Sequence, residues 1–174
     1  LAQFTLFAAA YFTVGTHTPA VGYAFSGMFV DDTLSDVLKL MILLGTSVMF
    51  VYTRQYMQLR NMFRGEYYAL VLFSVLGMMI MVSGQSMLTI YIGLELLSLC
   101  LYSLVALDRD SAKSSEAAMK YFVLGALASG MLLYGMSMIY GMTGSLNLAE
   151  ITSVLQESSP NNPVLILGLV FIVA

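Results

Sequence analysis

An apolar stretch of about twenty residues, Leu88–Leu107, contains a single charged side chain, Glu95, near its middle. A helix of this length rises about 30 Å, the thickness of the hydrocarbon core of a bilayer, so the stretch predicts a transmembrane helix. A carboxylate at that depth costs about 2.5 to 3.5 kcal/mol on insertion scales. We therefore expect Glu95 to face other helices or a wet cavity, and to have a function that requires its charge.

Polar side chains follow one face of this predicted helix. Tyr91 lies four residues before Glu95, and Ser98 and Tyr102 lie three and seven residues after it. These spacings put the four side chains on one stripe of an α-helix. Lipid offers no hydrogen bonds, so the stripe is expected to face inward and support Glu95. The alternative is that Glu95 is only a structural acid, hydrogen-bonded within the bundle.

The composition indicates a polytopic membrane protein. Of the 174 residues, 59% are hydrophobic and 10% are charged, whereas soluble domains contain about 25% charged residues. The net charge of −3, without a cluster of Lys and Arg, argues against nucleic-acid binding. We predict an all-α transmembrane bundle of five helices and a truncated sixth, over residues 1–15, 34–52, 67–82, 87–107, 116–140 and 163–174. Residues 1–174 are expected to form a single transmembrane domain that is a fragment of a longer chain.

No cofactor or metal site is predicted. The single cysteine, Cys100, lies in the apolar stretch and is expected to be a buried structural thiol, and the single histidine, His17, lies at a helix end without a second ligand nearby. The sequence has neither a Gly-x-Gly-x-x-Gly motif nor several cysteines, so it predicts no binding of NADH, flavin or an iron–sulfur cluster.

Basic residues alternate between the predicted connections. Residues 53–66 and 108–115 contain them, whereas residues 16–33, 83–86 and 141–163 contain none. By the positive-inside rule the first two connections are predicted to be cytoplasmic, and the other three lie on the opposite side of the membrane.

Local patterns predict two helix starts and one packing surface. Asp32 or Thr33 is expected to cap the helix from 34, and Ser114 or Ser115 the helix from 116. Asp36 and Lys39, an i,i+3 pair, are expected to reach the membrane interface as a snorkelling pair. The small residues between Gly125 and Gly130 predict close helix packing.

Two interpretations of Lys120 stay open. It can pair with Glu116 four residues before it, or reach the cytoplasmic interface, with no further role. Alternatively it turns toward the polar stripe and faces Glu95, across an axial offset of roughly 5 to 12 Å from helical rise. A glutamate whose protonation responds to a nearby lysine suits proton transfer, so Glu95 and Lys120 are candidates for a proton relay.

Two segments together resemble a known family. Tyr91–Ala106 contains the sequence G-x-E-L around Glu95, and Ser114–Leu148 contains E-A-x-x-K-Y around Lys120. Both are similar to the antiporter-like subunits of respiratory complex I, and in particular to the subunit N type of bacterial NADH:quinone oxidoreductase. The resemblance implies a proton channel of fourteen helices with two inverted repeats, of which this chain would cover the second to the start of the seventh. It also implies that Glu95 corresponds to an essential fifth-helix glutamate and Lys120 to a sixth-helix lysine.

The same resemblance implies a function and its partners. The chain would translocate protons in the membrane arm of an NADH:quinone oxidoreductase, in contact with lipid and with other membrane subunits. It would be part of an enzyme but inactive alone, because NADH, flavin, iron–sulfur clusters and quinone would bind in partner subunits. Residues 16–33, 83–86 and 141–163 would then be periplasmic in a bacterial inner membrane. The alternatives are a cation/proton antiporter or membrane-bound hydrogenase subunit on the same scaffold, and a membrane scaffold without transport.

Overall fold

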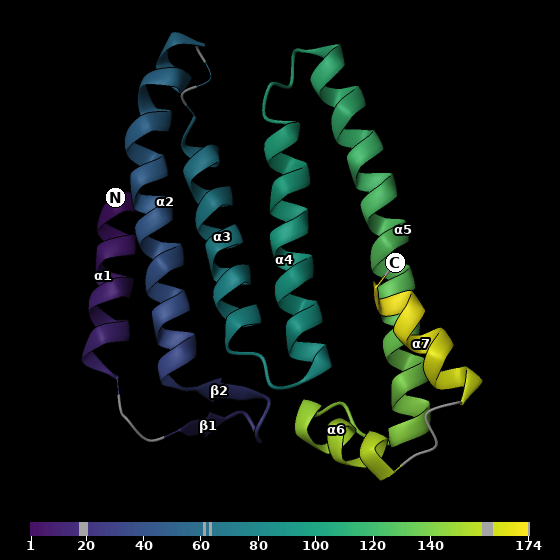
Figure 1. Ribbon diagram of the computed structural model, residues 1–174. Coiled ribbons are helices and arrows are strands. Elements are labelled where there is room, and N and C mark those ends of the chain that lie inside the picture. The colour runs from purple at the N-terminus through teal and green to yellow at the C-terminus, as the bar shows by residue number, and fades with distance from the viewer. Residues whose placement is uncertain (18–20, 61, 63, 158–161, 174) are drawn as a thin grey trace.

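The computed structural model describes residues 1–17, 21–60, 62, 64–157 and 162–173. Within these ranges the chain forms seven helices and one β-hairpin (Figure 1). The elements in chain order are α1 (Ala2–Gly15), β1 (Gly22–Ala24), β2 (Phe29–Asp31), α2 (Thr33–Leu59), α3 (Gly65–Val82), α4 (Met87–Val105), α5 (Ala112–Thr143), α6 (Leu148–Glu157) and α7 (Pro163–Val173). The predicted all-α transmembrane bundle is confirmed, with the small antiparallel hairpin added to it.

Four of the described helices, α2 to α5, are long and apolar enough to cross a membrane. The apolar helices α1 and α7 are shorter, with 14 and 11 residues. Helices α1 to α5 lie side by side in chain order, α7 packs beside α5, and α6 lies across one end of the bundle (Figure 1). The helix that carries Glu95, α4, therefore has α3 on one side and α5 on the other.

The connections alternate between the two ends of the bundle. The α2–α3 and α4–α5 connections lie at one end, and the hairpin, the α3–α4 turn and α6 lie at the other (Figure 1). The connections with basic residues thus share one end of the molecule.

Several predicted boundaries differ from the structure. Helix α2 continues to Leu59 rather than ending at 52, because residues 53–59 contain neither Gly nor Pro to stop it. Asp32 caps this helix as predicted, in a capping box with Ser35. The prediction of Ser114 or Ser115 as the cap of α5 is wrong, because Ser111 caps this helix and accepts a hydrogen bond from the Ser114 amide. The segments expected to be loops contain the hairpin in residues 16–33 and α6 in residues 141–163.

The α3–α4 turn joins the loops at its end of the bundle through backbone hydrogen bonds. The Val30 amide of β2 donates to the Ser83 carbonyl at 2.8 Å, and the Leu148 amide at the start of α6 donates to the Gln85 carbonyl at 3.1 Å. The hairpin, the turn and the start of α6 are therefore held together even though they are far apart in the sequence.

Helices α3 and α4 approach each other closely at two glycines. A Cβ atom on Gly77 would lie 2.7 Å from the Gly93 carbonyl oxygen, and one on Gly93 would lie 2.8 Å from the Gly77 carbonyl oxygen. Only glycine allows this approach, which fixes α4 against α3 two positions before Glu95. Two clusters of buried apolar side chains complete the packing, one centred on α1, α2 and α3 and a smaller one on α5, α6 and α7.

The expectation that Asp36 and Lys39 form a snorkelling surface pair is wrong. Both residues are 7% exposed, and Asp31 of β2 and His17, just after α1, contact them. The Lys39 ammonium donates to Asp31 at 3.0 Å and to Asp36 at 3.5 Å, and it lies 5.4 Å from the centre of the Phe29 ring. The other Asp36 oxygen is 2.8 Å from Nδ1 of His17. Asp31 of the hairpin and His17 after α1 thus extend the local ion pair into a cluster of four residues, in which Asp36 and Lys39 are buried and the other two side chains are 40% exposed.

Candidate functional site

Glu95 lies in the middle of α4, and its carboxyl group faces α5. The hydroxyl of Ser129 on α5 donates a hydrogen bond to Oε1 of Glu95. The Tyr91 side chain, one turn earlier on α4, also interacts with the Glu95 carboxyl group. Glu95 is partly buried, and the Ser129 hydroxyl is its hydrogen-bond partner within the span.

A cavity of about 200 Å³ adjoins this contact between α4, α5 and α7. Its polar lining consists of three hydroxyl-bearing side chains, Ser98, Tyr102 and Ser129. The predicted stripe is thus placed by the structure, with Tyr91 beside Glu95 and with Ser98 and Tyr102 on the cavity. The remaining lining residues are Leu94, Gly125, Ala128, Leu132, Phe171 and Ile172.

Lys120 does not contact Glu95 in this structure. Its ammonium donates to Oε1 of Glu116 at 2.5 Å, and the two side chains are 71% and 64% exposed. This is the i,i+4 pair of the first interpretation. The ion pairs found among the described residues do not include Glu95.

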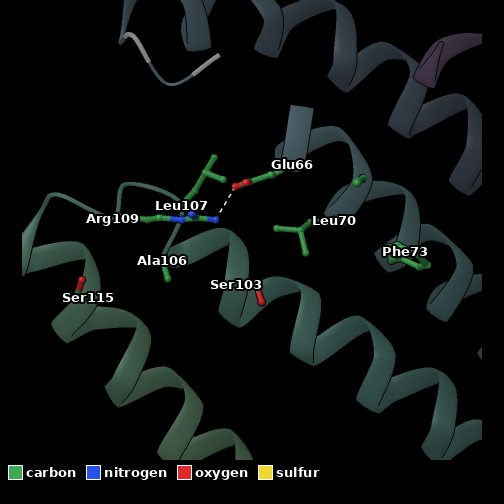
Figure 2. A pocket seen from close by; sticks show the side chains of 9 residues that line it. Glu66, Leu70, Phe73, Ser103, Ala106, Leu107, Arg109 and Ser115 are labelled. Carbon is green, nitrogen blue, oxygen red and sulfur yellow. Dashed lines mark hydrogen bonds and ion pairs between the residues drawn. The ribbon is translucent and has the colours of Figure 1, made fainter. Parts of the chain in front are cut away.

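A larger cavity lies near the end of the bundle that carries the basic connections. It measures about 590 Å³ and is lined by side chains of α3, α4, the α4–α5 connection and α5. Figure 2 shows Glu66 and Arg109 pointing toward each other at this cavity, where they form an ion pair at 2.7 Å. Both side chains are more than half exposed. Because this pair is solvated, the cavity has no charge held at membrane depth, and Glu95 remains the better candidate.

The family relationship follows from comparison with known proteins. Residues 84–174 match the family model described as NADH:quinone oxidoreductase/Mrp antiporter, transmembrane region. The chain belongs to this family. The matched region contains α4 and α5, and therefore Glu95, Ser129 and the cavity between them.

Two curated relatives show which type of subunit the chain is similar to. The chain is 67% identical over 173 residues to NADH-quinone oxidoreductase subunit N of Methylovorus glucosotrophus, and 55% identical over 174 residues to that of Thiobacillus denitrificans. These alignments cover 99% and 100% of this chain but 36% of each relative. The chain thus spans about a third of the length of the relatives it matches.

A solved structure shows the same similarity. A chain of respiratory complex I from Thermus thermophilus superposes with a TM-score of 0.75 at 34% identity, over 99% of this chain and 36% of that one. The predicted resemblance to antiporter-like subunits of complex I is confirmed.

The sequence did not identify Ser129 and Gly125 as residues of the site. Both were assigned only to helix packing, because small residues on a membrane helix usually serve that purpose. Gly125 does pack closely, since a Cβ atom there would overlap the Tyr102 hydroxyl group. Gly130 has no neighbour within 4 Å of a Cβ position. A serine within a run of Gly and Ala, on the helix next to an intramembrane acid, is the signal that could have found Ser129.

The described residues contain no group of three or more His, Cys, Asp or Glu side chains placed to hold a metal. Cys100 is a free thiol, 5% exposed. Its burial among apolar neighbours fits the structural thiol expected from the sequence.

Proposed function

We propose that this chain is part of a proton-translocating membrane subunit of an NADH:quinone oxidoreductase, and that Glu95 binds and releases the transported proton. The observation that carries the proposal is the setting of Glu95, an acid within a membrane span whose hydrogen-bond partner is the Ser129 hydroxyl. Membership of the family and the similarity to subunit N support the same function.

The chemistry of the partner suits reversible protonation. A serine hydroxyl can donate to a carboxylate and can accept from a carboxylic acid, so Ser129 can satisfy Glu95 in either state. An ammonium partner would instead favour the charged carboxylate. With a hydroxyl partner, Glu95 can gain or lose a proton without leaving a buried polar group unpaired.

Lys120 is proposed as a relay residue at the end of α5 nearest the α4–α5 connection. It lies nine positions before Ser129, which is about 13.5 Å along the helix. At that distance Lys120 acts on Glu95 through intervening water molecules, or after its side chain has broken the ion pair with Glu116.

The remaining assignments follow from the relatives and from the charge pattern. The partners proposed for the whole protein are other membrane subunits of the complex. NADH, flavin, iron–sulfur clusters and quinone bind in those or other partner subunits, and this chain is inactive alone. The α2–α3 and α4–α5 connections are proposed to be cytoplasmic. The hairpin, the α3–α4 turn and α6 are then periplasmic in the bacterial inner membrane.

The test is Glu95→Gln in the intact complex, reconstituted in sealed vesicles. Glutamine preserves the size of the side chain and its hydrogen bond to Ser129 but cannot carry the proton. We expect assembly to survive and proton translocation with coupled NADH oxidation to fall sharply. Glu66→Gln is the matched control, because it removes an exposed carboxylate from the neighbouring helix. An unchanged number of protons per electron pair in Glu95→Gln would refute the proposal and favour a scaffold without transport.

A further inference from the structure

The cavity of about 590 Å³ near the basic connections has a charged mouth and an apolar wall. The mouth is formed by Glu66, in the first turn of α3, and by Arg109, four residues after the end of α4. Leu70 and Phe73 follow Glu66 along α3, and Figure 2 shows Phe73 farther from the ion pair than Leu70. By helical rise Phe73 lies about 10.5 Å deeper than Glu66 in this membrane span. The cavity therefore leads from the end of the span into its apolar part.

The size and lining of the cavity suit the apolar chain of an amphiphile. Helices α3 and α5 both pack against α4, and the cavity lies where all three contribute side chains. Its volume is within the range of about 300 to 1,000 Å³ that is typical of small-molecule sites. Phe73 is 54% exposed, so its ring is available to an apolar ligand. A lipid acyl chain is the apolar ligand that a membrane supplies at this depth.

The ion pair at the mouth leaves both of its members able to bind more. Nη2 of Arg109 donates to Oε2 of Glu66 at 2.7 Å, and within the described ranges this is the hydrogen bond found for either side chain. A guanidinium group has five N–H donors, and a carboxylate has two oxygens. The two side chains are 65% and 54% exposed. The mouth thus offers donors for an anion beside an acceptor for a cation.

Phosphatidylethanolamine is the phospholipid whose headgroup matches this mouth. Its phosphate can accept paired hydrogen bonds from a guanidinium group. Its ammonium group, two methylene groups away from the phosphate, can donate to the Glu66 carboxylate. Anionic lipids are bound by clusters of four to eight Lys and Arg residues, whereas residues 108–115 contain two basic and two acidic side chains. A choline nitrogen has no N–H group and is bound by aromatic cages.

A membrane helix of another protein fits the mouth less well than this lipid. An apolar helix laid over the cavity would take Glu66 and Arg109 out of water without giving either charge a new partner, which is costly. The lipid headgroup instead supplies a counter-charge to each of them. Charge complementarity therefore favours a lipid as the occupant.

We propose that this cavity binds one phosphatidylethanolamine molecule. Its phosphate contacts Arg109, its ammonium group contacts Glu66, and an acyl chain lies along Leu70 and Phe73. The inference does not rest on proton transfer by Glu95, which is not among the described residues that line the cavity. It requires only that α3 and α4 span the membrane.

Photoreactive lipids test the selection of the headgroup in the intact complex. The complex is placed in vesicles of equal parts phosphatidylethanolamine, phosphatidylcholine and phosphatidylglycerol. One of three trace probes is added, with the same diazirine-bearing acyl chain and one of these three headgroups. After illumination, labelling of the peptide that contains residues 65–82 is measured by mass spectrometry. We expect the ethanolamine probe to label it about tenfold more than either other probe, the effect of one charge-assisted hydrogen bond.

Variants assign the two charges of the headgroup to their partners. Arg109→Gln should remove the preference for the ethanolamine probe over both other probes. Glu66→Gln should reduce chiefly the preference over the choline probe, because it removes the negative charge that faces the ammonium group. Glu116→Gln is the matched control, since it breaks an exposed ion pair on α5 that does not line this cavity. It should keep the labelling pattern of the wild type.

Two results with the wild-type complex would overturn the site. Equal labelling by the three probes would mean that the cavity meets only bulk lipid. No labelling of residues 65–82 by any probe would mean that protein covers the cavity in the complex. Both comparisons need no variant, so they hold even if Arg109→Gln fails to assemble. Wild-type proton translocation by Glu95→Gln would overturn the proposed function and leave this lipid site untouched.

Discussion

The hydroxyl of Ser129 on α5 donates to the carboxyl group of Glu95 on α4, across 34 positions of sequence. The contact joins two neighbouring membrane helices through a pair of groups that can both exchange protons. It also places Ser129 at the cavity lined by Ser98 and Tyr102. The structure therefore makes a hydroxyl, rather than an ammonium group, the immediate partner of the intramembrane acid.

Ser129→Ala is expected to lower proton translocation about fivefold, because it removes the hydrogen bond that satisfies Glu95 in both protonation states. Ser129→Thr keeps a hydroxyl and should restore most of the rate. Ser137→Ala, on the same helix, removes a hydroxyl that is exposed and bonded to its own backbone, and is the control. The measurement is the initial rate of proton uptake by vesicles that contain the intact complex. Equal rates for Ser129→Ala and Ser137→Ala would contradict the prediction.

Lys120→Met should reduce proton translocation without reducing assembly. The ion pair with Glu116 is exposed and contributes only about 0.3 to 0.5 kcal/mol, so its loss is small for stability. Glu116→Gln breaks the same ion pair and keeps the ammonium group, so translocation should be retained. The measurement that tests the relay role is the number of protons translocated per electron in the two variants. If Lys120→Met pumps as well as Glu116→Gln, the relay role of Lys120 is wrong.

Gly93→Ala is expected to impair assembly, because its methyl group would lie 2.7 Å from the Met81 side chain and 2.8 Å from the Gly77 carbonyl oxygen. Overpacking of this kind costs about 1 to 3 kcal/mol. Gly45→Ala, where a Cβ atom has no neighbour within 4 Å, should be neutral or slightly stabilising. Thermal inactivation of the intact complex, measured for both variants, should show a lower midpoint only for Gly93→Ala. Similar midpoints would mean that α3 and α4 can separate without loss.

Lys39→Met is expected to destabilise the protein by about 3 kcal/mol, because it removes the ammonium partner of the buried Asp36 carboxylate and leaves that group only the partly exposed His17 ring. Asp36→Asn added to Lys39→Met should recover part of this loss. Arg109→Met breaks an ion pair of which both members are more than half exposed, and should cost less than about 1 kcal/mol. The amount of assembled complex in membranes and its thermal inactivation report these differences. A cost for Lys39→Met no larger than that for Arg109→Met would show that Asp36 and Lys39 are not buried in the complex.

The sequence by itself determined the features that depend on short stretches. The lengths of the apolar stretches predicted the membrane-spanning helices, since about twenty residues are needed to cross the hydrocarbon core. Asp32 was predictable as a cap because its side chain bonds to an amide three residues away. The charge of Glu95 marked the site, since an acid in an apolar span is costly wherever its neighbours lie. The motifs around Glu95 and Lys120 were sufficient to indicate the family.

Only the tertiary structure decided which side chains meet. Local spacing describes the pair of Glu116 and Lys120 correctly, but it cannot show which face of α5 turns toward α4. The rotation of α5 about its own axis is set by the packing of whole helices against one another. For the same reason the sequence assigned Ser129 to packing and Asp36 to the surface, because β2 and His17 reach Asp36 and Lys39 only after the chain folds back. Interactions within one helix act over about one turn, whereas the contacts at Glu95 depend on how α4, α5 and α7 come together, and those at Lys39 on how the hairpin folds back onto α2.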